Sequence, residues 1–179
     1  WTNKINNITG KSKYYLLEST EKNKSIDTYQ KIMKFLFENN INRDYTIFGI
    51  VGGIVGDITG FVASTFMRGI KLVHIPTTLL SMVDSSIGGK TGFNTIYGKN
   101  MIGSIYPANE IIIDKLWLDT LPKKHIINGM AETIKMALLK GGELYDLIND
   151  STPDSLKHID RIILLSAQYK LDIIGNDSN

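Results

Sequence analysis

A glycine-rich turn, Gly52-Gly53-Ile54-Val55-Gly56-Asp57, stands where an apolar run gives way to a helical pattern. Glycines in such a turn let the backbone approach a pyrophosphate, and the following helix offers free N–H groups and the positive end of its dipole. The dinucleotide fingerprint G-x-G-x-x-G would place glycine at position 51, where this chain has Val51. Alone, the motif predicts either a pyrophosphate site or a glycine-rich turn without a ligand.

A second polar segment ends in Gly89-Lys90-Thr91, as a phosphate-binding P-loop does. The P-loop pattern requires glycine five residues before Gly89, and Asp84 stands there. We reject the P-loop because a carboxylate facing a triphosphate would be repulsive. Lys90 and Asp84 could instead converge with Lys99 and Asn100 on an anionic ligand, since lysine serves as a point charge for phosphate or carboxylate. A solvated loop with ordinary surface lysines is the simpler interpretation.

Glu132 and Lys135 lie three residues apart in a predicted helix, so they share one face. A carboxylate there could bind a metal while the lysine reaches an anionic substrate, although an intrahelical ion pair is the common alternative. The histidines His74, His125 and His158 have no metal-ligand spacing. We interpret them as structural or exposed, and the sequence shows no complete metal site.

The elements that position these residues alternate between strand and helix. Apolar runs predict strands at 14–17, 46–51, 71–75 and 110–114, with helices at 26–39, after a Ser25 cap, and from the glycine turn to about residue 67. A long glycine- and serine-rich loop is expected at 77–107. This order predicts an α/β fold with a Rossmann-like parallel sheet, incomplete in this chain.

Beyond residue 121 the pattern is helical, at 123–140, 142–149 and 153–174, which predicts the start of an all-α domain. We therefore expect one domain at 1–120 and the start of a second at 121–179. The chain begins with Trp1 and ends in polar residues without a closing element, so both ends are expected to be cut.

Composition excludes several classes of function. The 179 residues are 42% hydrophobic, carry a net charge of +2 and contain no cysteine. Charges of both signs are interspersed, which gives no reason to expect a nucleic-acid or membrane partner. No apolar run reaches the roughly 18 residues needed to cross a bilayer. Lack of cysteine excludes disulfides and thiolate zinc sites and is compatible with a cytoplasmic location.

Taken together, the order and spacing of the motifs resemble the 3-dehydroquinate synthase family. The resemblance covers about residues 14–177 and rests on segments 21–25, 52–57, 67–69, 76–80, 83–92, 98–103 and 129–135. It implies a lyase of the shikimate pathway that converts 3-deoxy-D-arabino-heptulosonate 7-phosphate to 3-dehydroquinate and phosphate. NAD would oxidise a substrate hydroxyl and later return the hydride, and Zn²⁺ or Co²⁺ would act as Lewis acid.

The resemblance also implies roles for individual residues. Catalytic positions match Asp84, Lys90, Asn100, Lys135 and Arg68, the last of which serves the neighbouring subunit and implies a homodimer. One metal ligand matches Glu132. Positions toward NAD match Glu21, Lys24, Gly53, Ile54, Val55, Gly56, Asp57, Thr77, Thr78, Ser85, Lys90, Lys99, Trp117, Leu118, Asp119 and Thr120.

Two departures from the family pattern affect these expectations. Val51 replaces the first of three consecutive glycines, and the two metal-binding histidines of the family lie beyond residue 179. Three alternatives stay open: a related sugar phosphate cyclase that makes 2-deoxy-scyllo-inosose or a valiolone, an iron-dependent alcohol or glycerol dehydrogenase, and an inactive nucleotide-binding fragment.

Overall fold

The computed structural model describes residues 12–151 and 157–176. Its central sheet contains β1 (Thr46–Val51), β2 (Lys71–Pro76) and β5 (Glu110–Ile111), all parallel and in the order β1-β2-β5. Helix α3 (Gly53–Thr65) connects β1 to β2, and α2 (Ile26–Glu38) precedes β1. The predicted α/β fold with a parallel sheet is confirmed.

Local signals explain where the elements of this half begin and end. The Ser25 side chain accepts a hydrogen bond from the Thr28 N–H and caps α2. Helix α3 ends at Thr65, because Met67 and Arg68 adopt positive φ angles of 48° and 67° in the short helix η2 (Phe66–Arg68) that follows. One apolar core joins these elements, and its buried members are Leu36, Ile41, Val62, Ala63, Phe66, Ile70 and Leu72.

The predicted loop at 77–107 is wrong for most of its length. The chain forms a π-helical segment, η3 (Ser81–Ser85), and then an antiparallel hairpin of β3 (Lys90–Thr95) and β4 (Gly98–Ile105). Glycines that suggested a loop are required by close strand approach. A Cβ on Gly103 would lie 2.0 Å from the Thr91 carbonyl oxygen, and one on Gly92 would lie 2.3 Å from that of Ile102.

Other predicted boundaries also change. Residues 14–17 form no strand, and Tyr15 instead packs edge-on against Phe35 of α2. Strand β5 ends at Ile111, since the Asp114 side chain accepts from the Leu116 N–H and starts the short helix η4 (Lys115–Thr120). The predicted start of the last helix at 153 lies outside the described residues.

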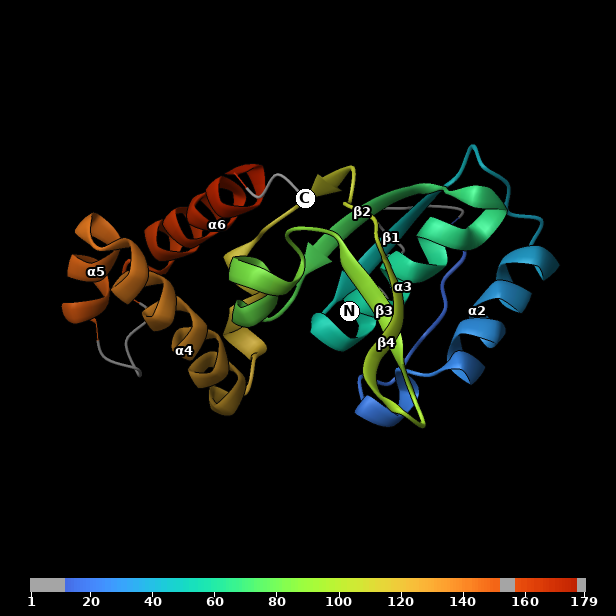
Figure 1. Cartoon of the computed structure of the whole chain (residues 1–179), viewed down its shortest axis with the longest axis horizontal. Coiled ribbons are helices and arrows are strands. Elements are labelled where there is room, and N and C mark those ends of the chain that lie inside the picture. The colour runs from blue at the N-terminus through green and yellow to red at the C-terminus, as the bar shows by residue number, and fades with distance from the viewer. Residues whose placement is uncertain (1–11, 152–156, 177–179) are drawn as a thin grey trace.

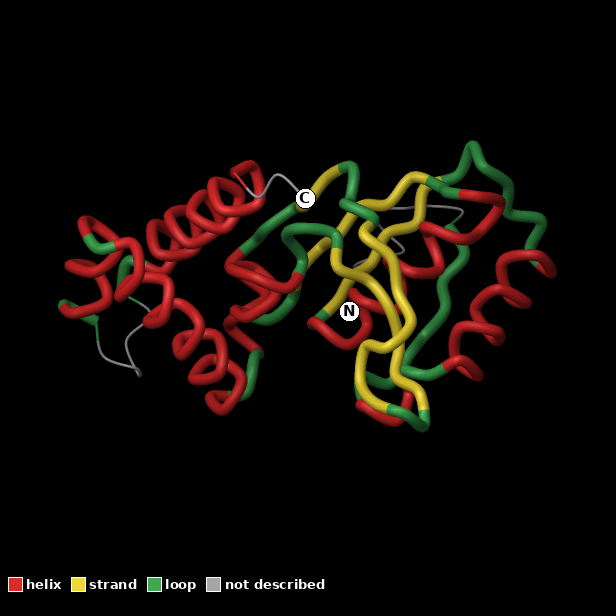
Figure 2. The backbone as a smooth tube through the Cα atoms, viewed as in Figure 1, coloured by secondary structure: helices red, strands yellow, loops and turns green. Residues whose placement is uncertain are grey.

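Three helices follow η4 and form the other half of the molecule (Figures 1 and 2). They are α4 (Lys123–Lys140), α5 (Gly142–Asn149) and α6 (Ile159–Asn176). One core joins α4 and α6 to η3 through Leu79, Met82, Val83, Leu118, Ile126, Met130, Ile159 and Ile163. A second core unites the three helices with one another. In the described part of the chain, no helix is long and apolar enough to cross a membrane.

The histidines lie as predicted. His74 is buried in β2, and burial lowers its pKa. His125 and His158 are exposed.

Gly129 lets α4 approach the chain just before η3. A Cβ at this position would lie 2.6 Å from Leu79 side-chain atoms and 2.7 Å from the Leu80 backbone nitrogen. We expect Gly129→Ala to lower the free energy of unfolding by about 1–3 kcal/mol, because the contact includes backbone that cannot move aside. Urea denaturation measures the change. Gly175→Ala is the matched control, since nothing lies within 4 Å of that Cβ in α6, and an equal loss there would contradict the prediction.

Candidate active site

The glycine-rich turn leads from β1 directly into α3. Gly52 is the N-cap of α3 and provides no side-chain hydrogen bond, so the first N–H groups of the helix have no side-chain cap. A Cβ on Gly53 would lie 3.2 Å from Ser85 Oγ, and one on Gly52 would lie 3.2 Å from Thr78 Cγ2. Val51 is buried, with its carbonyl accepting from the Thr77 N–H. Val51 thus fits beneath the turn. Gly52 and Gly53 have no side chains that would cover the first N–H groups of α3.

The Ser85 hydroxyl beside this turn has no hydrogen-bond partner among residues 12–151 and 157–176. Its Oγ is buried and makes no hydrogen bond to the described residues. It belongs to η3, which packs beside the start of α3. A buried unpaired hydroxyl is costly, so its position next to Gly53 favours a ligand that supplies the missing hydrogen bond. The free helix N–H groups make an anionic group the best fit.

A buried lysine joins three distant segments one helical turn further along α3. Lys24 is 5% exposed, and its ammonium donates hydrogen bonds to Asp57 Oδ2 of α3 and to Asn100 Oδ1 of β4. Lys99, the neighbour of Asn100, donates to Glu21 Oε1 at 3.0 Å. The structure therefore brings together five residues that the sequence analysis selected from separate motifs.

The electrostatics of this cluster are balanced rather than strongly charged. Burial raises the pKa of Asp57, and the Lys24 ammonium opposes that rise. The hydrogen bond from Lys99 lowers the pKa of Glu21. Two lysines face two carboxylates, so each buried or half-buried charge has an opposite charge beside it.

A second charged cluster lies where η3 meets the helical half. Asp84 Oδ1 accepts from Lys170 Nζ of α6 at 2.7 Å, with about a quarter of each side chain exposed (24% for Lys170 and 28% for Asp84). Glu132 Oε1 accepts from Lys135 Nζ at 3.0 Å on α4, and this carboxylate raises the Lys135 pKa. The two pairs come from η3, α6 and α4, whose buried residues share one apolar core.

Lys170 escaped the sequence analysis. It has no local motif, and the polar spacing around it is that of an ordinary helix surface. Its partner Asp84 is far away in sequence, and only the packing of α6 on η3 brings them together. When only tertiary packing brings a lysine to a site, the residues beside it in the sequence do not indicate its role.

Some predicted residues stay outside both clusters. Lys90 is exposed at the start of β3, and Arg68 is exposed beyond the far end of α3, roughly 20 Å from Gly53 along the helix. In η4, Leu118 is buried and Trp117 packs against the core. Asp119 and Thr120 are exposed. The Thr78 hydroxyl is hydrogen-bonded to Ser81 Oγ at 2.8 Å.

The described residues contain no group of three or more His, Asp or Glu side chains that could hold a metal ion. Glu132 offers a half-buried carboxylate within the second charged cluster, with 23% of its side chain exposed. It can supply one ligand, and the others would have to come from outside the described ranges.

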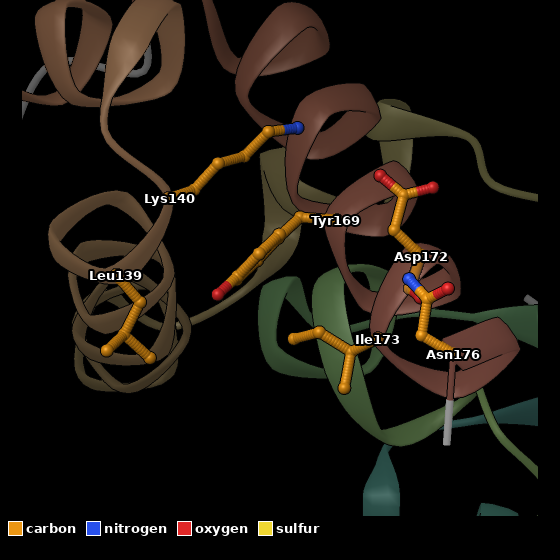
Figure 3. A pocket seen from close by; sticks show the side chains of 6 residues that line it. All are labelled: Leu139, Lys140, Tyr169, Asp172, Ile173 and Asn176. Atoms are coloured by element: carbon orange, nitrogen blue, oxygen red, sulfur yellow. The ribbon is translucent and has the colours of Figure 1, made fainter. Parts of the chain in front are cut away.

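An open groove lies between α4 and α6 (Figure 3). Its lining residues are Leu139, Lys140, Tyr169, Asp172, Ile173 and Asn176. The Lys140 ammonium lies 5.6 Å from the centre of the Tyr169 ring. None of the residues selected from the sequence lines this groove, so the candidate site is the polar region around the start of α3 and η3.

The Lys24–Asp57 pair generates a pH-dependent prediction. Replacement of Lys24 by Met removes the group that opposes the raised pKa of Asp57, so that pKa should rise further. At pH 7 the uncompensated carboxylate should lower the free energy of unfolding by about 1–3 kcal/mol. The loss should shrink as the pH falls through the folded-state pKa, where the carboxyl becomes neutral. Urea denaturation across pH, with NMR titration of Asp57, measures both effects.

Two further variants test the cause of that loss. Asp57→Asn in the Lys24→Met background should recover much of the stability, because the buried charge is gone. Lys99→Met breaks an exposed pair with Glu21, whose side chains are 72% and 48% exposed, and should cost less than about 1 kcal/mol. A pH-independent loss in Lys24→Met would refute the electrostatic explanation.

Comparison with known proteins places this geometry in a family. A 3-dehydroquinate synthase from Alkaliphilus oremlandii is 45% identical over 171 residues, which are 92% of this chain and 46% of that protein. A 2-epi-5-epi-valiolone synthase from Streptomyces hygroscopicus, solved with NAD⁺ and Zn²⁺ bound, is 29% identical with a TM-score of 0.82, over 90% of this chain and 48% of that one. A 2-deoxy-scyllo-inosose synthase complexed with carbaglucose-6-phosphate, NAD⁺ and Co²⁺ is 28% identical with a TM-score of 0.78, over 90% and 45%.

The chain thus spans about half the length of the relatives it matches, 46% for the Alkaliphilus protein. The family model described as "3-dehydroquinate synthase N-terminal" matches residues 14–128, which include the glycine turn, η3 and the hairpin. This chain belongs to the 3-dehydroquinate synthase family.

Proposed function

We propose that the protein containing this chain is a 3-dehydroquinate synthase. It would convert 3-deoxy-D-arabino-heptulosonate 7-phosphate to 3-dehydroquinate and phosphate, as a lyase that uses NAD and Zn²⁺ or Co²⁺. The relative at 45% identity carries this name, whereas the matched cyclases with other products are 29% and 28% identical. The higher identity favours dehydroquinate as the product.

The observation that carries the proposal is the vacant hydrogen-bonding capacity at the start of α3. The turn at Gly52 and Gly53 has no side-chain cap, and the buried Ser85 hydroxyl beside it has no partner among the described residues. The pyrophosphate of NAD satisfies both requirements, because it is anionic and rich in acceptor oxygens. A Cβ at Gly53 would approach Ser85 Oγ to 3.2 Å, so glycine keeps that space open.

The residues around this turn have distinct proposed roles. Glu21 and Lys24 bind the adenosine side of the cofactor, and residues 117–120 of η4 close over it. Lys90 and Lys99 lie between the cofactor and the substrate, and Asn100 contacts the substrate. Asp84 and Lys135 act near the reacting atoms, with Lys170 as a further cation held by Asp84. NAD, when bound, supplies the acceptor that oxidises a substrate hydroxyl.

Glu132 is the proposed metal ligand of this chain. Its carboxylate is 23% exposed and faces Lys135 at 3.0 Å, so it is accessible to a cation while next to a group suited to an anionic substrate. One carboxylate does not make a zinc site, and the family's histidine ligands would complete it.

We further propose a two-domain, cytoplasmic homodimer. A boundary near residue 121 separates an NAD-binding domain at 1–120 from a metal- and substrate-binding helical domain that starts at 121–179. Arg68 supports the dimer proposal, because it is exposed beyond the end of α3 that lies away from the glycine turn. A phosphorylated substrate favours the cytoplasm, because its charge keeps it from crossing a membrane.

The direct test supplies the heptulosonate phosphate, NAD⁺ and Zn²⁺ to the complete gene product and follows phosphate release. We expect release of phosphate without net NADH, and a product with the mass of 3-dehydroquinate. Net NADH would indicate a dehydrogenase, and another carbocyclic product would indicate a related cyclase. No turnover together with retained NAD⁺ binding would favour an inactive nucleotide-binding protein.

Replacement of Glu132 tests the metal site. Glu132→Gln should reduce turnover about 100-fold or more at limiting Zn²⁺, because a metal ligand becomes neutral, while the NAD⁺ dissociation constant stays unchanged. Phosphate release measures turnover, and quenching of the intrinsic protein fluorescence by NAD⁺ measures the dissociation constant. Glu143→Gln is the matched control, since Glu143 also forms an ion pair with a cation, Arg161, on the exposed helical surface. Equal loss in both variants would argue against a metal role for Glu132.

A further inference from the structure

Asn94 lies at an irregularity of the β3–β4 hairpin and was not among the residues selected from the sequence. The pairing register shifts between Phe93 and Thr95, so Asn94 does not take a regular place in the ladder. Its backbone N–H donates instead to the Lys24 carbonyl oxygen at 2.8 Å, and the residue forms an isolated parallel bridge with Ser25. The bulge thereby turns Asn94 toward the segment that carries Glu21 and Lys24.

The side-chain amide of Asn94 connects two groups that the proposed function assigns to different ligands. Its Oδ1 accepts from the Asn100 backbone N–H at 3.0 Å. Its Nδ2 donates to Glu21 Oε2 at 3.4 Å. Asn94 therefore joins the substrate side of the site to the cofactor side with a single planar amide.

Asn100 is held from both directions as a result. Its φ angle of +56° is in the left-handed region, which asparagine adopts more readily than most other non-glycine residues. Asn94 fixes its backbone N–H, while Lys24 Nζ donates to its side-chain Oδ1. An ammonium group can only donate, so the Asn100 amide must direct its Nδ2 away from Lys24. Asn100 is exposed, so an acceptor oxygen of a ligand can approach this residue.

We infer that Asn94 is a positioning residue that sets the Asn100 amide for an oxygen of the substrate and links it to the Glu21 segment that binds the cofactor. This inference rests on the proposed function for the identity of the two ligands. It assigns one side-chain atom of Asn94 to the substrate side of the site and the other to the cofactor side. Oδ1 orients Asn100, and Nδ2 orients Glu21.

Two substitutions separate these atoms. Asn94→Ala removes both, whereas Asn94→Asp keeps an acceptor for the Asn100 N–H and replaces the donor toward Glu21 with a repelling carboxylate oxygen. In the complete gene product, Asn94→Ala should raise the substrate KM roughly three- to tenfold with little change in kcat. Asn94→Asp should restore the substrate KM, while the NAD⁺ dissociation constant should rise in both variants.

Hydrogen exchange at the Asn100 amide gives a readout that needs no turnover. Protection should be lost in Asn94→Ala and kept in Asn94→Asp. Asn42→Ala is the matched control, because the Asn42 side chain also accepts a backbone N–H, that of Asp44, in an exposed loop. It should leave both ligand constants unchanged.

Two results would overturn the inference. One is an unchanged substrate KM in Asn94→Ala, with only a loss of stability, which is the signature of a purely structural residue. The other is identical Asn100 exchange in Asn94→Ala and the wild-type protein. Failure of the proposed function is recognised separately, because the wild-type protein would then release no phosphate before any variant is examined.

Discussion

The burial of η3 between the sheet and the helices is the constraint on which the site depends. Leu79, Met82 and Val83 are fully buried, and they pack against α4 and α6. The Ser86 N–H bonds to the Ser81 carbonyl oxygen five residues earlier, which widens the turn. Widening lets Ser81, Met82 and Val83 all face inward, so Asp84 and Ser85 emerge next to each other at its end. Asp84 then meets α6, and Ser85 meets the start of α3.

A second constraint is the cost of burying a lysine. Lys24 is the buried lysine among the described residues, and its ammonium must find acceptors because desolvation of an isolated charge costs several kcal/mol. Its acceptors come from α3 and from β4, two elements that do not otherwise need to meet at this point. The requirement for a paired charge therefore docks the hairpin tip onto the helix start. Apolar packing is non-directional, so by itself it would not fix the position of the hairpin tip relative to the start of α3.

Sequence patterns predicted the elements that have strong local signals. The helix predicted at 123–140 has those bounds in the structure, because its apolar period is regular and Pro122 and Gly141 mark its ends. The hairpin was missed, since Gly92 and Gly103 suggest a loop when the partner strand whose close approach requires glycine is unknown. The need for glycine at such positions comes from the neighbouring strand and not from residues nearby in the sequence.

For the candidate site too, some features could be predicted from the sequence and others could not. Family resemblance selected Glu21, Lys24, Asp57 and Asn100, but their pairing was not readable, because contact depends on how α3 and β4 pack. Asn94 and Lys170 were missed altogether. Their side chains act through partners placed by a β-bulge and by helix packing, neither of which leaves a local motif.

Charge pairing within the candidate site bears on how the proposed ligands would bind there. Each cation of the second cluster already has a carboxylate, Lys170 with Asp84 and Lys135 with Glu132, so the cluster stays close to neutral. Under the proposed function, a metal ion held by Glu132 would compete with Lys135 for the same carboxylate and leave that lysine available to an anionic substrate. An anionic substrate would then supply the opposite charge that Lys135 loses when the metal ion takes Glu132. Because Lys135 is 64% exposed, it can leave Glu132 at little cost, whereas Lys170, at 24%, is held more firmly by Asp84. Under the proposed function, Lys135 would therefore move with the ligand, while Lys170 would keep Asp84 in place.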